Sequence, residues 1–268
     1  MNFPTVLALF KVAQAENPKY YAIFQQFEHF SNYIHYAIEF LTPEIWVDDE
    51  AQPSLACFYT APAWFLWGDP DAKDVAPLLE MLPADSWLVP SSDKWDAPLS
   101  AYFGERLITH QRASFDSASL SLEHLRRLKT ELPVGLRLVP IDETHVNDQE
   151  GMLYQDLLCK FFAVADFLQQ WAGFCLLENE KIIGFAAANY PVRKQVLEVY
   201  IRVDYNNDPR HRQKGLGTQL GVALLEYCLE HGLDPQWDAA NDISVRLALK
   251  LGYTLAHNWK MYHLQEGK

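Results

Sequence analysis

The chain has 268 residues, of which 49% are hydrophobic, and its formal net charge at pH 7 is −13. This length suits one large or two modest domains, and the apolar share is sufficient for a hydrophobic core. The acidic charge argues against a nucleic-acid partner and is compatible with a cationic amine substrate. The sequence contains no apolar run of about 20 residues that could span a bilayer, so we expect no membrane partner.

The N-terminus and the cysteines bear on location and metal binding. Residues 1–10 contain neither a basic stretch nor a small-residue cleavage site, which favours a cytoplasmic protein. Cys57, Cys159, Cys175 and Cys228 are widely spaced, and none stands in a C-x-x-C or Cys–His spacing typical of metal sites. We therefore expect buried free thiols and no bound metal.

The first half of the chain alternates short helical and strand-like segments and carries no catalytic motif. Apolar spacing predicts helix within 11–40, at 75–82 and at 97–102. Apolar runs broken by acidic residues or proline predict strands at 45–47, 55–60, 64–67, 87–89 and 107–115, and the last of these could close a small sheet. This order indicates an N-terminal α+β domain in residues 1–120.

A second domain is expected in residues 133–268. It follows a candidate linker at 116–121, rich in small and polar residues, and a charged helix that ends near Glu131. The predicted elements are a strand at 136–141, helices within 150–170, a hairpin of 171–177 with 181–190, and a strand at 196–203.

The most informative segment is residues 209–218, with the sequence PRHRQKGLGT, between the strand at 196–203 and a helix expected at 216–231. Gly215 and Gly217 let the backbone approach a ligand without an intervening Cβ. The helix that starts there offers unpaired N–H groups and the positive end of a dipole, and Arg212 and Lys214 add charge. The segment predicts a phosphate cradle.

Two common nucleotide motifs do not fit this segment. A P-loop is excluded because no Lys-Ser or Lys-Thr follows the last glycine and the glycine spacing is too short. A dinucleotide fingerprint is excluded because Leu220 stands where its third glycine would be. A nucleotide-binding protein is accordingly disfavoured.

A second motif follows the helix. Gly232 is expected to end the helix, and residues 235–239 form a short strand. Asn241 is a good N-cap for the next helix, whose apolar face contains Ala248 and which Gly252 ends.

The Arg-x-x-Gly-x-Gly pattern, together with the run Asn-x-x-Ser-x-x-Leu-Ala-x-Lys-Leu-Gly-Tyr at 241–253, resembles the GNAT superfamily of N-acetyltransferases. Residues 226–241 are similar to a narrower group, the zwittermicin-resistance-type acetyltransferases. The resemblance implies an α/β (α+β) fold with a mixed, mostly antiparallel, splayed sheet and flanking helices. By analogy, the N-terminal α+β domain could be a diverged copy of the same fold.

The resemblance also implies roles for particular residues. Glu198 would be the general base, although its strand position is equally that of a polar residue paired with Arg202 or Arg193. Ser244 would hydrogen-bond the leaving thiolate, unless it only belongs to the first turn of its helix. The residues expected to bind acetyl-coenzyme A are Ile201, Arg202, Val203, Arg212, Gln213, Lys214, Gly215, Leu216, Gly217, Thr218 and Asn241.

One departure from the family pattern concerns the acid that protonates the thiolate. Many members carry Tyr four residues before the glycine of the last helix, and this chain has Ala248 there. Water could serve instead, because a thiolate of ordinary pKa leaves readily near neutral pH.

These observations predict an N-acetyltransferase that transfers an acetyl group from acetyl-CoA to a primary amine, by direct transfer in a ternary complex. The acceptor is expected to be a small molecule. The alternative is a non-catalytic acyl-CoA-binding sensor or partner-binding module, which the missing Tyr and the large N-terminal domain favour.

Overall fold

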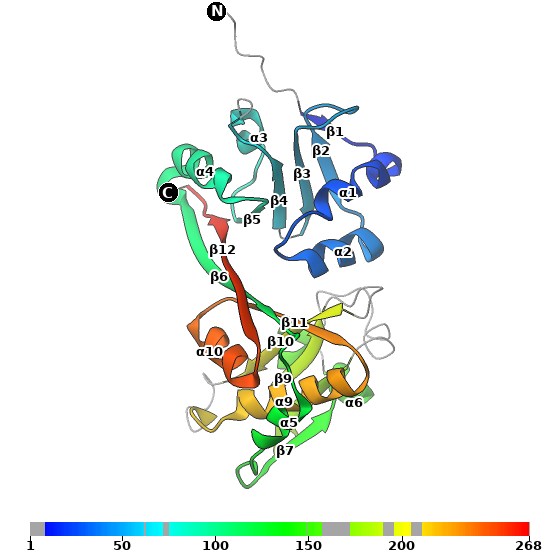
Figure 1. The fold of residues 1–268 in the computed structure, drawn as a ribbon, viewed down its shortest axis with the longest axis vertical. Helices are drawn as coiled ribbons and strands as arrows, with labels where there is room; N and C mark the ends of the chain where they lie inside the picture. Colours follow the sequence, from blue (N-terminus) through cyan, green and yellow to red (C-terminus); the bar gives the residue numbers. More distant parts are fainter. Residues whose placement is uncertain are drawn as a thin grey trace, which may run out of the picture. The chain divides into compact units, whose positions relative to one another are not determined.

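The computed structural model describes residues 9–61, 63–71, 75–148, 150–156, 172–189, 196–204 and 211–267 (Figure 1). The chain forms two compact units. The first unit contains Met1–Arg112 and Asn258–Lys268, and the second contains Ala113–His257. The sequence predicts domains of residues 1–120 and 133–268, and the strands β6 (Leu107–Asp116) and β12 (Thr254–Leu264) each cross a boundary between the two units.

The first unit is built on a sheet with the strand order β1-β2-β3-β4-β5-β12. Its adjacent strands are antiparallel except for β4 and β5, which are parallel. Buried side chains such as Leu66, Leu88 and Trp95 form one of its cores. The strands are β1 (Phe10–Lys11), β2 (Glu44–Val47), β3 (Leu55–Thr60), β4 (Ala63–Gly68), β5 (Ser86–Pro90) and β12 (Thr254–Leu264).

Helices of the first unit are short. In residues 11–40, where the apolar spacing predicts helix, the structure has three separate short helices. Pro18 lies inside a 3-10 helix, where it lacks a backbone N–H and restricts the residue before it. Phe30 adopts φ 52°, which interrupts the helical path before α2. The helices are η1 (Gln14–Lys19), α1 (Tyr21–Phe24), α2 (Ser31–Phe40), α3 (Ala76–Glu80), η2 (Asp93–Trp95), α4 (Asp96–Phe103) and η3 (Gly104–Arg106).

The second unit contains a sheet with the order β6-β11-β10-β9-β8-β7, in which only β10 and β11 are parallel. Its strands are β6 (Leu107–Asp116, entering at Ala113), β7 (Leu136–Pro140), β8 (Gly173–Glu178), β9 (Lys181–Asn189), β10 (Val196–Val203) and β11 (Asp234–Ala239). Its helices are α5 (Leu122–Arg127), α6 (Glu143–Val146), α7 (Met152–Asp156), α9 (Leu216–Glu230) and α10 (Asp242–Leu251). The part of the predicted helical region beyond 156 lies outside the described residues.

Alternating side chains place the second sheet between two cores. Leu197 and Val199 of β10 belong to the cluster that α9 and α10 cover, with Ile201 and Val203 packed against it. Tyr200 points to the opposite cluster, which contains Val146 of α6 and Leu153 of α7. Side chains of β10 therefore alternate between the two clusters with a period of two.

Each unit is completed by a strand from the other half of the sequence. Residues Ala113–Phe115 of β6 pair antiparallel with β11, and Tyr262–Leu264 of β12 pair antiparallel with β5. The sequence allows the strand at 107–115 to close a small sheet, and residues Ala113–Phe115 of this strand pair with β11. Apolar alternation specifies that a segment is a strand but does not specify its partner.

The two units share one order of elements. In each, antiparallel strands lead to a parallel pair, β4 with β5 or β10 with β11, connected through a helix, α3 or α9. A further helix follows, α4 or α10. The second strand of each parallel pair then has an antiparallel neighbour from the other half of the sequence: β12 pairs with β5, and β6 pairs with β11. The predicted mixed, mostly antiparallel sheet with flanking helices and a second similar unit is confirmed.

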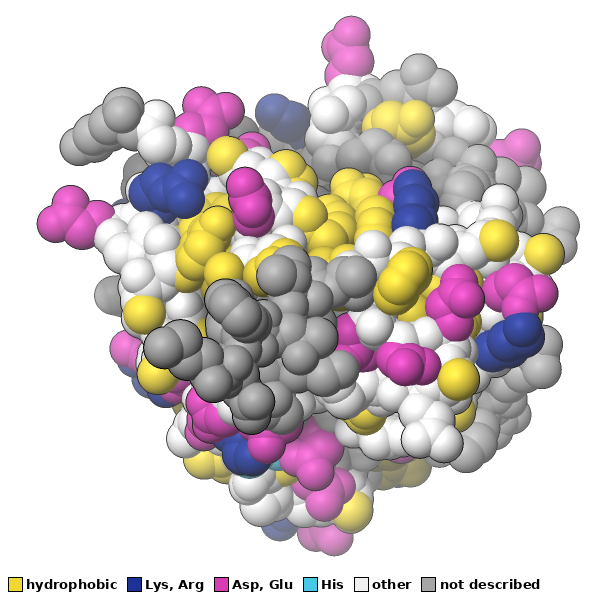
Figure 2. All heavy atoms as spheres, turned by 90° about the horizontal axis from the view of Figure 1, so that it is seen from above, with side chains coloured by type: hydrophobic (Ala, Val, Ile, Leu, Met, Phe, Trp, Pro, Cys, Tyr) yellow, Lys and Arg dark blue, Asp and Glu magenta, His cyan; other side chains and the backbone are white. Residues whose placement is uncertain are grey.

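Surface charge and cysteines agree with the composition. The face drawn in Figure 2 carries many acidic side chains and few basic ones, in line with a net charge of −13. Cys57, Cys175 and Cys228 are buried and free, as predicted, while Cys159 lies outside the described residues. No helix in the described part of the chain is long and apolar enough to cross a membrane.

Candidate active site

The parallel strands of the second unit pair over only part of their length. β11 is in register with β10 at Val196, Leu197 and Glu198, whose partners are Asp234, Pro235 and Gln236. β10 continues beside β9 to Val203, which lies opposite Gly184. The two parallel strands therefore run together at their beginnings and lose register beyond Glu198, as expected for a splayed sheet.

Glu198 lies at the point where this pairing changes. Its backbone is in register with Asn189 on one side and with Gln236 on the other. Its side chain is half-buried and shares a face with Tyr200, whose ring stacks on Phe185 at 5.7 Å between centroids. The predicted base thus lies where β10 and β11 begin to separate.

The glycine segment has the backbone conformation that its sequence predicts. Gly215 is the N-cap of α9 with φ 71° and ψ 13°, and no side chain caps this helix. A Cβ at Gly215 would meet no heavy atom of the described residues within 4 Å. The first N–H groups of α9 have no intrahelical partner and receive no side-chain cap within the described part of the chain, which is the property of an anion site.

Side chains around this helix start divide into exposed and buried sets. Arg212, Gln213 and Lys214 are exposed, and Gln213 adopts φ 59°, a left-handed conformation. Leu216 and Thr218 are buried, so they anchor the helix rather than extend into solvent. Two cationic side chains therefore flank the uncapped helix end.

A contact that the sequence does not reveal holds the beginning of this segment. His211 is 6% exposed, and its Nε2 lies 3.4 Å from a carboxylate oxygen of Glu178 at the end of β8. Its Nδ1 has no hydrogen-bond partner among the described residues. No spacing in the sequence relates Glu178 to His211, because the two lie on separate elements.

The start of α10 follows β11 at the same end of the sheet, since the carboxyl ends of parallel strands share an edge. Asn241 is its N-cap, and Asn241 Oδ1 accepts hydrogen bonds from the backbone N–H groups of Ile243 and Ser244. The Ser244 hydroxyl oxygen accepts a hydrogen bond from the Trp237 indole at 3.0 Å. The structural alternatives for Asn241 and Ser244 are thus both realised, and Ala248 is fully buried.

The described residues of this unit provide no activated thiol and no metal cluster. Burial raises the pKa of the Cys228 thiol, on α9, to about 12, which keeps it protonated and inert. Burial also raises the pKa of Tyr253, whose hydroxyl donates to the Pro235 carbonyl oxygen. Within the described ranges no group of His, Cys, Asp and Glu side chains could hold a metal ion.

The corresponding region of the first unit has a different character. The segment after β4 begins with Gly68, Asp69 and Pro70 and contains no Gly-x-Gly. Asp69 forms an ion pair with Lys94 at 2.6 Å, and the buried Trp95 donates its indole N–H to the Gly68 carbonyl oxygen. An acidic, side-chain-filled strand end does not suit a phosphate.

The comparison with known families decides the identity of the chain. A family model described as GNAT acetyltransferase matches residues 22–262. The chain belongs to the GNAT acetyltransferase family. A relative, the uncharacterized N-acetyltransferase YdfB of Bacillus subtilis (strain 168), is 27% identical over 185 residues, which are 66% of this chain and 65% of the relative. The match therefore spans less than two thirds of that relative's own length.

Solved structures share the GNAT fold over nearly the whole chain. A GCN5-related N-acetyltransferase-like protein from Streptococcus suis 89/1591 has a TM-score of 0.74 and 24% identity, covering 94% of this chain and 100% of its own. A tandem GNAT protein from the clavulanic acid biosynthesis pathway, solved without AcCoA, has a TM-score of 0.56 and 14% identity, covering 95% and 97%. The tandem relative agrees with the repeated order of elements in the two units.

Proposed function

We propose that this GNAT protein is an N-acetyltransferase that uses acetyl-CoA as donor and a primary amine as acceptor. The observation that carries the proposal is the uncapped, glycine-led N-terminus of α9, which lies directly after the strand that separates from its parallel partner. An anionic pyrophosphate at this helix start would accept hydrogen bonds from backbone N–H groups and complement the helix dipole.

The described residues fit the coenzyme. The open space beside Gly215 would admit the pyrophosphate, with Arg212 and Lys214 adding charge. Where β10 and β11 no longer pair, backbone groups of Ile201, Arg202 and Val203 would hydrogen-bond the pantetheine arm. Asn241 would contribute its amide N–H groups, since its oxygen is engaged in capping α10. Gln213, Leu216, Gly217 and Thr218 complete the segment.

The chemistry is a direct transfer in a ternary complex. The acceptor nitrogen attacks the thioester carbonyl carbon, a C–N bond forms, and the C–S bond breaks. Glu198 removes the proton from the ammonium, directly or through a water molecule, because a protonated amine has no lone pair for attack. As the C–S bond breaks, the nitrogen loses its second proton, and water passes a proton to the thiolate, which the Ser244 hydroxyl would hydrogen-bond; Ala248 stands where many GNAT enzymes have Tyr.

The acceptor is proposed to be a small molecule. The net charge of −13 would attract a cationic amine, and the resemblance to zwittermicin-resistance-type acetyltransferases points to amino compounds of low molecular weight. A cytoplasmic location is part of the same proposal, because the coenzyme is made and used there.

Calorimetric titration with acetyl-CoA tests the cradle. We expect wild-type binding near 1 μM, about 8 kcal/mol. Gly215→Glu should weaken it by about 100-fold or more, because a carboxylate would occupy the anion site. Gly135→Glu is a matched control: Gly135 has φ 90° and open space around it, so it introduces the same charge and comparable strain outside the site.

The outcomes of this titration separate the functions. Equal affinity in wild type and Gly215→Glu, or no binding in wild type, would refute the cradle. Wild-type binding with no turnover on a broad panel of amines would favour the non-catalytic acyl-CoA sensor. Ala248 supports this alternative, because it stands where many GNAT enzymes have Tyr.

A further inference from the structure

The exposed part of the glycine segment is short and lies between two buried residues. Arg212, Gln213 and Lys214 are exposed, while His211 before them is 6% exposed and Leu216 after them is fully buried. Exposed side chains make few packing contacts that would hold a backbone in one conformation. The shape of the segment therefore depends on how its two ends are held.

The backbone between these ends requires support from its surroundings. Gln213 has φ 59° and Gly215 has φ 71°, both in the left-handed region. Glycine occupies this region freely, but a residue with a Cβ does so at a cost in free energy. The conformation at Gln213 therefore persists because the neighbouring structure imposes it.

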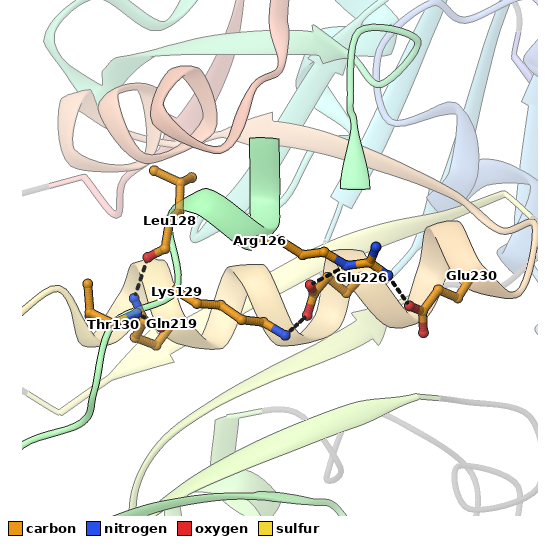
Figure 3. A network of polar contacts seen from close by, with 7 residues as sticks. All are labelled: Arg126, Leu128, Lys129, Thr130, Gln219, Glu226 and Glu230. Carbon is orange, nitrogen blue, oxygen red and sulfur yellow. Dashed lines mark hydrogen bonds and ion pairs between the residues drawn. The ribbon is translucent and has the colours of Figure 1, made fainter. Parts of the chain in front are cut away.

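The C-terminal end of the segment is held by α9, which is fastened along its outer side (Figure 3). Gln219 donates to the Leu128 carbonyl oxygen at 3.0 Å and accepts from the Thr130 N–H at 3.2 Å. Further along the helix, Glu226 forms an ion pair with Lys129. Together with the buried face of the helix, these contacts fix the position of its first turn.

The N-terminal end of the segment is held by the side chain of His211. Its Nε2 lies 3.4 Å from a carboxylate oxygen of Glu178, and its buried Nδ1 has no hydrogen-bond partner among the described residues. A carboxylate only accepts hydrogen bonds, so the contact is attractive when Nε2 carries hydrogen. Within the part of the chain that the structure describes, Glu178 is the polar partner of this imidazole.

Glu178 provides a fixed point because it belongs to the sheet. It is the last residue of β8, in register with Leu136 of β7 and with Lys181 of β9. In the order of the sheet, β9 separates β8 from β10. The contact therefore joins the segment that follows β10 to a strand that is not adjacent to β10.

We propose that His211 is a positioning residue for the coenzyme, and that its contact with Glu178 holds residues 212–215 in the conformation that presents backbone N–H groups to the pyrophosphate. This role rests on the proposed function and adds to it a determinant of coenzyme affinity. The side chain is buried, so it acts through the backbone that follows it. A preformed cradle spares the ligand the entropic cost of ordering the segment, and loss of the contact weakens binding.

A double-mutant cycle on acetyl-CoA affinity tests the proposal. Calorimetric titration compares the full-length wild type with His211→Ala, Glu178→Ala and the double variant. Each single variant should bind roughly tenfold more weakly, and the double variant also roughly tenfold, because both changes remove the same contact. The side-chain amide of His211→Gln offers an N–H donor in place of Nε2, so this variant should stay within about threefold of wild type.

His263→Ala is the matched control. It deletes a histidine that contacts Asp85 at 2.8 Å in the first unit, a contact of the same kind in the unit without a Gly-x-Gly segment. Its acetyl-CoA affinity should equal that of wild type. Thermal melting establishes that each variant is folded. The Glu178 side chain is 30% exposed, so Glu178→Ala leaves the core intact and decides the question even if His211→Ala unfolds.

The results distinguish failure of the positioning role from failure of the proposed function. A wild type that does not bind acetyl-CoA overturns the proposed function and, with it, the positioning role. Wild-type binding with unchanged affinity in folded His211→Ala or Glu178→Ala overturns the positioning role alone. A double variant about 100-fold weaker than wild type shows two independent effects and overturns the action of His211 through Glu178. Non-additive loss, with affinity retained in His211→Gln and His263→Ala, supports the proposal.

Discussion

At the scale of single residues, the position of Glu198 meets two requirements of the general base that we propose it to be. A base must be fixed by the scaffold, and it must face space that a substrate can enter. Glu198 is the last residue of β10 in register with both β9 and β11, so its backbone is fixed on both sides. The strands separate immediately after it, which would bring a thioester carbonyl close to its carboxylate.

Replacement of Glu198 by Gln tests this role. The amide keeps the shape of the side chain but cannot take a proton, so kcat should fall by about 10²–10⁴-fold near neutral pH. The defect should shrink as the pH approaches the pKa of the acceptor amine, ~10 for an alkylamine, because the free base then needs no assistance. Steady-state rates over this pH range measure both effects. An unchanged pH–rate profile, with acetyl-CoA binding retained, would remove Glu198 from the chemistry.

At the scale of elements, the N-termini of α9 and α10 differ in whether a side chain accepts hydrogen bonds from their first backbone N–H groups. Both helices begin at the carboxyl edge of a parallel strand and leave N–H groups without intrahelical partners. Asn241 satisfies two of those groups in α10, whereas Gly215 satisfies none in α9. This difference is what the proposed coenzyme site requires, because within the described ranges no side chain caps the N-terminus of α9.

The two possible roles of Asn241 can be separated by paired substitutions. Asn241→Ala removes the cap and should lower the free energy of unfolding by about 1 kcal/mol. Asn241→Ser preserves a capping oxygen but removes the amide N–H groups, so it should leave stability nearly unchanged. Denaturant unfolding and acetyl-CoA titration of both variants give the answer. Weakened coenzyme binding in Asn241→Ser shows a direct contact, while wild-type affinity in that variant limits Asn241 to capping.

Local elements could be predicted from the sequence where local physics determines them. The strand at 196–203 and the helix from 216 match β10 and α9 closely, because alternation and glycine placement are local signals. The pairing of β6 with β11 could not be predicted, since strand partners are chosen by packing across long sequence separations. The same reason hides the Glu178–His211 contact.

At the scale of the whole molecule, exchange of strands makes each unit depend on a distant part of the chain. The first unit ends its sheet with Tyr262–Leu264 of β12, although most of its residues precede Arg112. The second unit takes Ala113–Phe115 of β6, which precede its predicted first strand. A fragment of residues 133–268 would therefore lack a strand of its own sheet and expose β11 as an edge.

Removal of residues 258–268 tests this dependence. Tyr262 and Leu264 are 2% and 1% exposed, and the Tyr262 hydroxyl donates to Asp96. Loss of one buried Leu side chain alone costs about 2–5 kcal/mol, so the truncated first unit should unfold at a much lower temperature. The second unit keeps all of Ala113–His257, so it should retain acetyl-CoA binding and protection from hydrogen exchange.

A shorter truncation is the matched control for this experiment. Removal of residues 265–268 leaves β12 intact and removes the Gln265 N–H bond to the Arg106 carbonyl oxygen, so the melting temperature should change little. Hydrogen exchange resolved along the chain distinguishes the units. Loss of protection confined to the first unit, beginning at β5, is the expected pattern because β5 loses its antiparallel partner. Equal protection of β5 in both truncated chains would show that β12 does not hold the first unit together, and simultaneous loss in both units would show that they fold as one cooperative body.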